Sequence, residues 1–245
     1  NKLLGDIVNS GVAFSGKPLL SITSPTYNTF VASVNSLNSD KGRVPTVFVG
    51  ANDGMLHAFD ATALSSEGFN PGKELFAYIP SWMGTKLAAL TSPNSVNNHQ
   101  AYVDAPPVVA EALSGQSPDV WKTVLVSGTG AGGRGVFALD VTNPAAFDAS
   151  KVMWEFTHQD DVDMGFVVGR PQIVKMRTNN WSSTTPTYRW FAAVPSGVNN
   201  YKSTDGPTVT TGAPTLFLLA LDKAAGVAWA NGTNYYKINL PINDT

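Results

Sequence analysis

The chain has 245 residues, no cysteine and a formal net charge of −2 at pH 7, and only 14% of its residues are charged. The lack of cysteine excludes disulfide bonds, and the weak charge argues against a nucleic-acid partner, whose phosphates require a basic surface. No stretch approaches the ~20 apolar residues that cross a bilayer, so we expect no membrane span.

A strand–turn–strand pattern occurs three times, and each copy ends with apolar residues followed by an aspartate, at Asp60, Asp140 and Asp222. Recurrence at nearly constant spacing is typical of an array of similar units, none of which buries its core face alone. The sequence therefore predicts one repeat domain over residues 1–245. Its units are expected at about residues 5–80, 104–158 and 169–230.

Each unit contains four short runs rich in Val, Phe and Leu and bounded by turn residues, as β-strands are. The expected strands are 7–14, 46–50, 55–60 and 74–79, then 105–112, 122–127, 135–141 and 152–157, then 170–176, 190–194, 215–221 and 226–230. Four-stranded units indicate an all-β chain built as a β-propeller, with a β-sandwich or β-solenoid as the alternative. Because closure typically takes at least four blades, about three blades are expected to form part of a larger propeller.

Two connections carry recognisable turn signals. The Asn52–Gly54 tripeptide predicts a tight turn, since Asn, Asp and Gly adopt positive φ at low cost. Residues 128–133 match the dinucleotide-binding pattern G-x-G-x-x-G, but a strand-like run follows where that motif requires a helix. We therefore expect a structural hairpin loop with positive φ at Gly130 and Gly133. Helix should be scarce and is expected near residues 82–90.

Three connections exceed the usual ~4–6 residues, namely 15–45, 80–104 and 195–214. The first and third are polar and carry isolated aromatic rings at Tyr27, Phe30 and Tyr201. We expect these rings to bind a protein or glycan surface, with the alternative that the loops only cover sheet edges.

Catalytic and metal-binding patterns are few. His57 shares a strand face with Phe59 and is expected to be structural. The three repeated aspartates are expected to end a strand and to bond their own turn. The acidic run at 160–165 is expected to be a turn, because Asp161 and Asp163 supply only two of the six to eight oxygens that calcium takes. These two residues are the candidate ligands if a metal binds.

Several motifs stand in a fixed order along the chain: LGDIVNS at 4–10, GANDGMLHAFDA at 50–61, AYIPS at 77–81, GTGAGGRGVFALDVTNP at 128–144, WEFT at 154–157 and DVDMGFVVGRPQIVK at 161–175. In this order they resemble the PilC/PilY family of type IV pilus tip and biogenesis proteins. The resemblance covers residues 3–176 well and 189–230 more loosely.

The resemblance implies the C-terminal β-propeller of a non-enzymatic protein at the bacterial cell surface, in the outer membrane or fimbrium. It implies support of pilus biogenesis, opposition to retraction, and adhesion. The implied partners are pilins or minor pilins and a host-cell or surface receptor. Calcium is implied for full-length members, but the D-x-D-x-D-G loop typical of the family does not occur here, and no cofactor is expected in this chain.

A quinoprotein-type dehydrogenase is the alternative, because the strand phrase ending in Ala-Leu-Asp also resembles pyrroloquinoline-quinone propellers. Such an enzyme requires a bound quinone and a calcium ion held by Glu, Asn and Asp side chains. In many of these enzymes adjacent cysteines also stack on the quinone, and this chain has none. We therefore expect a quinoprotein-like propeller without enzymatic activity.

Overall fold

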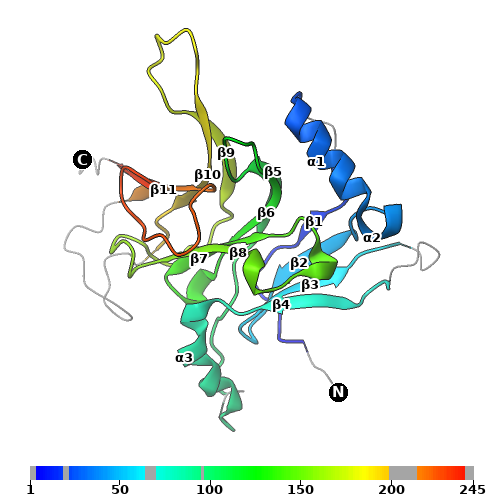
Figure 1. Ribbon diagram of the computed structural model, residues 1–245. Coiled ribbons are helices and arrows are strands. Elements are labelled where there is room, and N and C mark those ends of the chain that lie inside the picture. Colours follow the sequence, from blue (N-terminus) through cyan, green and yellow to red (C-terminus); the bar gives the residue numbers. More distant parts are fainter. Residues whose placement is uncertain (1–3, 19–21, 64–69, 95–96, 199–213, 241–245) are drawn as a thin grey trace.

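In the computed structural model, residues 4–18, 22–63, 70–94, 97–198 and 214–240 are described. These residues form three four-stranded sheets, shown in Figure 1, in which neighbouring strands are antiparallel. In each sheet the order of the strands follows the order of the chain. This is the meander expected of propeller blades.

The strands match the expected blades closely. Blade 1 contains β1 (Ala13–Ser15), β2 (Thr46–Gly50), β3 (Leu56–Asp60) and β4 (Glu74–Tyr78). Blade 2 contains β5 (Val108–Leu113), β6 (Trp121–Gly128), β7 (Gly135–Asp140) and β8 (Val152–Thr157). Blade 3 contains β9 (Gln172–Arg177), β10 (Tyr188–Pro195), β11 (Thr215–Ala220) and β12 (Tyr235–Asn239).

Two expected strands were wrong. Only the end of the run 7–14 joins blade 1, as β1. The run 226–230 forms no strand: Gly226 has φ +75° in a turn, and the indole Nε1 of Trp229 donates to the carbonyl oxygen of Glu155 in blade 2 at 2.7 Å. The fourth strand of blade 3 is β12 instead.

The core lies in two seams between blades. In seam 1–2, Phe48 and Leu56 of blade 1 belong to one buried cluster with Leu125 and Phe137 of blade 2. In seam 2–3 the buried cluster joins β6 and β7 to β10 and β11 through Val124, Val126, Val136, Val194 and Phe217. Successive side chains of a strand point to opposite faces, so β6 and β7 supply both seams. This explains why these two strands are almost continuously apolar.

The polar segment 15–45 was predicted to be a loop, and this was wrong because it contains helix α1 (Pro25–Asn35) followed by the single turn α2 (Leu37–Asp40). Pro25 stands at the start of α1, where its missing N–H costs nothing. The four buried residues of α1 follow helical spacing and pack beside Trp121 of β6; they are Tyr27, Phe30, Val31 and Val34.

The helix expected near 82–90 is present as η2 (Ser81–Met83), α3 (Gly84–Leu87) and η3 (Ala88–Thr91). Further short turns are η4 (Gly130–Gly132), η5 (Pro144–Ala146) and η6 (Ala149–Lys151). Within the described ranges, no helix combines the length and apolarity that a membrane crossing requires.

Candidate functional site

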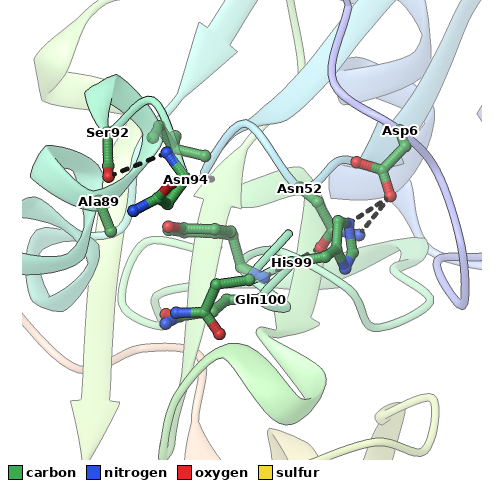
Figure 2. Close-up of a pocket in the computed structure, with 10 residues that line it drawn as sticks. Asp6, Asn52, Ala89, Ser92, Asn94, His99 and Gln100 are labelled. Carbon is green, nitrogen blue, oxygen red and sulfur yellow. Dashed lines mark hydrogen bonds and ion pairs between the residues drawn. The ribbon is translucent and has the colours of Figure 1, made fainter. Parts of the chain in front are cut away.

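A pocket of about 440 Å³, lined by both polar and apolar side chains, lies beside the turn between β2 and β3 (Figure 2). The N-terminal segment contributes Asp6, the turn contributes Asn52, and the connection after η3 contributes Ser92, His99 and Gln100. Three segments that are far apart in sequence therefore meet at this pocket.

Asn52 holds the pocket together. Its side-chain Nδ2 donates to Oδ2 of Asp6 at 3.0 Å, and its Oδ1 accepts from the backbone N–H of Tyr102 at 3.0 Å. His99 Nε2 lies 2.8 Å from the same Asp6 oxygen. The hydrogen bond from Asn52, with a further one from His99, holds the pKa of Asp6 below its ordinary value. The pocket thus presents a charged carboxylate together with imidazole and amide groups, which bind polar ligands.

The pocket does not bring a nucleophile to a base. Ser92 accepts a hydrogen bond from the backbone of Asn94 at 3.3 Å and lies across the pocket from His99 in Figure 2. Acyl transfer requires hydrogen-bond contact between the two. Ser92 and His99 therefore do not form a nucleophile–base pair in this structure.

His57 is in β3, just after the same turn, and its imidazole lies between two carboxylates. Its Nδ1 is 2.6 Å from Oε1 of Glu74, and its Nε2 is 3.0 Å from Oδ2 of Asp53. Burial alone would lower the pKa of His57, but the hydrogen bonds to Asp53 and Glu74 outweigh it and the pKa is raised. Asp53 also accepts the backbone N–H of Gly5 at 2.9 Å. His57 stacks on Phe59, and it contacts the same Asp53 side chain that joins the N-terminal segment to blade 1.

The candidate metal ligands contact a lysine. Lys237 of β12 places its Nζ 2.9 Å from Oδ1 of Asp161 and also pairs with Asp163. Tyr235 donates its hydroxyl to Oδ2 of Asp161 at 2.9 Å. Burial would lower the pKa of Lys237, but the two carboxylates outweigh it and the pKa is raised. An ammonium group therefore occupies the position between Asp161 and Asp163.

Across the residues that the structure describes, no group of three or more His, Cys, Asp or Glu side chains is arranged to hold a metal. The run at 160–165 is a turn, as predicted, in which Asp161 Oδ1 accepts the backbone N–H of Asp163 at 3.0 Å.

The repeated aspartates follow the prediction in two blades and depart from it in the third. Asp60 accepts the backbone N–H of Thr62 at 2.9 Å, and Asp140 accepts that of Thr142 at 3.0 Å. Asp222 instead accepts from Nε of Arg189 at 2.8 Å. In blade 3 an ion pair between Arg189 of β10 and the turn after β11 takes the place of the turn hydrogen bond.

The glycine loop between β6 and β7 is a hairpin loop, as predicted, since Gly128 pairs with Val136. Gly130 has φ +58°, and a Cβ on it would lie 2.9 Å from the carbonyl oxygen of Asp104. Positive φ at Gly133 was wrong: its φ is 179°, and the indole of Trp82 at 2.8 Å is what excludes a side chain there. A Cβ on Gly132 would overlap the carbonyl oxygen of Tyr102. Contact with the backbone of Asp104 and Tyr102 accounts for Gly130 and Gly132, and contact with the side chains of Trp82 and Met83 accounts for Gly133.

Two of the three aromatic candidates for partner binding, Tyr27 and Phe30, are buried. Tyr27 and Phe30 are 0% and 8% exposed, so the expectation that they present rings to solvent was wrong. They are the buried face of α1, and Tyr27 lies edge-on to Trp121 with ring centroids 4.9 Å apart. Tyr201 lies outside the described residues. A different ring, Trp181, is 85% exposed in the connection between β9 and β10. The sequence feature that could have identified Trp181 is its position as a single tryptophan within the polar run Asn179–Ser183.

Comparisons with known proteins agree with the fold and with the motif order. A family model described as the PilY1 beta-propeller domain matches residues 4–204. A type IV pilus biogenesis factor PilY1 homolog from Xylella fastidiosa is 36% identical over 219 residues, covering 84% of this chain and 13% of that protein. The type IV pilus biogenesis factor PilY1 of Pseudomonas aeruginosa strain PAO1 is 39% identical over 193 residues, covering 76% of this chain and 15% of that protein.

A solved structure is also similar. The crystal structure of the Pseudomonas aeruginosa PilY1 C-terminal domain aligns with a TM-score of 0.53 and 31% identity, over 80% of this chain and 31% of that one. The chain thus spans only a small part of the curated relatives that it matches. With the three antiparallel four-stranded sheets, this likeness confirms the predicted β-propeller.

Proposed function

Because this chain belongs to the PilY1 β-propeller domain family, we propose that it is the propeller module of a type IV pilus biogenesis factor that acts by binding and not by catalysis. The observation that carries the proposal is the family match over residues 4–204, which includes blades 1 and 2 and two strands of blade 3. The proposed location is the bacterial cell surface, in association with the outer membrane or fimbrium.

The proposed roles are support of pilus assembly, opposition to retraction, and adhesion to a surface. The proposed partners are pilins or minor pilins and a host-cell or surface receptor. The pocket supports a binding role, because Asp6, Asn52, His99 and Gln100 present carboxylate, amide and imidazole groups to one cavity of about 440 Å³.

The test is deletion of the propeller-coding region from the full-length gene in the piliated bacterium that encodes it. We expect loss of surface pili and of surface attachment, and recovery of pili in a strain that also lacks the retraction motor. Normal pilus numbers in the deletion strain would refute the role in biogenesis. Loss of pili in both strains would refute opposition to retraction.

The non-enzymatic part has its own test. The purified full-length protein is mixed with pyrroloquinoline quinone and calcium and assayed for dye-linked alcohol oxidation. We expect no turnover above the rate of quinone alone. Saturable oxidation would favour a quinoprotein dehydrogenase instead.

A further inference from the structure

The connection between β9 and β10 extends from blade 3 into solvent. β9 ends at Arg177 and β10 begins at Tyr188, and Figure 1 shows the intervening segment projecting from the body of the molecule. Trp181 lies within it and is 85% exposed, more than any other large hydrophobic side chain among the described residues. A single exposed apolar residue is ordinary on a protein surface, but an indole this exposed on a projecting segment is not.

The projecting segment is held in one shape by its own hydrogen bonds. Nη2 of Arg177 donates to the carbonyl oxygens of Asn180 at 2.8 Å and Ser183 at 2.7 Å. The side chain of Asn179 donates to the carbonyl oxygen of Thr185 at 2.7 Å and accepts the backbone N–H of Thr187 at 3.1 Å. The segment therefore loses little conformational freedom when a partner binds.

The indole is supported on one side and open elsewhere. The guanidinium carbon of Arg177 lies 5.1 Å from the centroid of the Trp181 ring, within range of a cation–π contact. The same guanidinium is fixed by its bonds to the loop backbone, so it positions the ring. With the ring 85% exposed, its remaining face and its edges are available to a partner.

Charge and shape narrow the class of partner. Residues 178–187 consist of Thr, Asn, Ser, Trp and Pro and contain no ionisable side chain. The charge beside the ring is the Arg177 guanidinium, and its hydrogen bonds go to oxygens of Asn179, Asn180 and Ser183 within the segment. An anionic lipid surface or a nucleic acid is typically bound by a cluster of basic groups, which residues 178–187 do not supply. A projecting tip with one large ring and a polar surround fits a cleft in another protein, because buried tryptophans inside a polar rim supply much of the energy of protein interfaces.

We propose that Trp181 is the anchor through which this propeller binds a protein partner, with the indole inserted into an apolar cleft of a pilus subunit. The identity of the partner as a pilus subunit rests on the proposed function, whereas the anchoring role rests on the geometry of the segment. Asn and Ser groups beside the ring form the polar rim of the contact. Because the Arg177 guanidinium is bonded to the loop itself and residues 178–187 carry no charge, binding depends little on ionic strength.

The experiment measures co-sedimentation of the full-length protein with type IV pili purified from the same bacterium. The variants are Trp181→Ala, Trp181→Phe and, as a matched control on the same segment, Thr184→Ala. We expect Trp181→Ala to weaken binding at least about tenfold, Trp181→Phe to weaken it less, and Thr184→Ala to leave it unchanged. Raising NaCl from about 50 to about 500 mM should change the wild-type affinity by less than about threefold.

Three results would overturn the proposal while leaving the proposed function intact. The first is equal binding of pili by the wild-type protein and Trp181→Ala. The second is failure of the wild-type protein to bind pili, although the propeller-deletion strain has no surface pili. The third is Trp181-dependent binding to beads coated with neutral hexoses, without binding to pili, which would favour a glycan partner. If the deletion strain keeps its pili while Trp181→Ala still weakens co-sedimentation, the proposed function fails and the anchor stands.

Discussion

The loop between β6 and β7 and the loop between β9 and β10 join neighbouring antiparallel strands of the same kind of sheet, but they lie in opposite surroundings. The first is packed against Tyr102, Asp104 and Trp82, and its glycines leave room for that contact. The second projects into solvent and is held only by its own hydrogen bonds. A sequence pattern typical of ligand binding can therefore arise from packing, whereas a polar run without a motif can carry the exposed ring.

The largest effect is expected where the packed loop is broken. Gly132→Ala places a methyl group on the carbonyl oxygen of Tyr102, so the backbone must move. We expect the free energy of unfolding to fall by about 3 kcal/mol, measured by urea denaturation with tryptophan fluorescence. The control is Gly169→Ala, because a Cβ on Gly169 would meet nothing within 4 Å. Equal stability of the two variants would mean that the loop is not packed as described.

A third connection, between β8 of blade 2 and β9 of blade 3, is held by ion pairs between its aspartates and Lys237. Lys237→Met leaves Asp161 and Asp163 beside each other without the ammonium group. We expect the free energy of unfolding to fall by about 2 kcal/mol, because removal of one member of a largely buried ion pair leaves the other charge buried without a partner. Lys73→Met, at an exposed lysine, is the control and should be nearly neutral.

The same ion pair predicts the response to metal and to pH. Since the ammonium group of Lys237 already occupies the position between the two carboxylates, addition of calcium or EDTA should leave the thermal midpoint of the wild-type protein unchanged. The pKa of Lys237 is raised, so its contribution is complete below the ordinary lysine pKa of about 10.4 and is lost only as the pH rises through the folded-state value. A calcium-dependent midpoint in the wild-type protein would contradict this arrangement.

A smaller effect on stability is expected at the turn between β2 and β3, where the imidazole of His57 contacts Asp53 and Glu74. The pKa of His57 is raised by Asp53 and Glu74 in spite of its burial. Its contribution to stability is therefore complete below the unfolded histidine pKa of about 6.5 and is lost as the pH rises through the higher folded-state pKa. We expect the difference in unfolding free energy between the wild-type protein and His57→Gln to shrink from about pH 6 to about pH 9. A constant difference across this range would show that the imidazolium does not fasten the turn.

The smallest effect on stability is expected at the exposed loop. Trp181→Ala removes a ring that contacts little besides Arg177, so the free energy of unfolding should change by less than about 0.5 kcal/mol. The measurement is the same urea denaturation as for Gly132→Ala. A loss above about 1 kcal/mol would mean that Trp181 is part of the packing and that the contrast between the two loops is false.

The sequence was sufficient for most strands, because apolar runs bounded by turn residues carry local information. It failed for α1, whose apolar positions have helical spacing but stand among Ser, Asn and Thr. The prediction of a strand at 226–230 also failed. The apolar side chain of Trp229 packs against blade 2 and does not belong to a strand, and the fourth strand of blade 3 is the less apolar run Tyr235–Asn239. In both places the deciding contact is with a residue far along the chain.

The same limit applies to the candidate sites. Asp53, His57 and Glu74 come together only when β3 pairs with β4, and Asp161 meets Lys237 only when blade 3 is complete. Sequence spacing does not predict such pairs. Trp181 was visible in the sequence, but its exposure depends on where the ends of β9 and β10 lie.

The agreement between strand order and chain order has a consequence for how the molecule is made. Each sheet consists of strands that follow one another, so a sheet can form as soon as its fourth strand has emerged during synthesis. Helix α1 is the exception, because it precedes β2 in the chain but packs on Trp121 of blade 2. α1 can therefore dock only after β6 of blade 2 has been synthesised, although α1 itself emerges earlier.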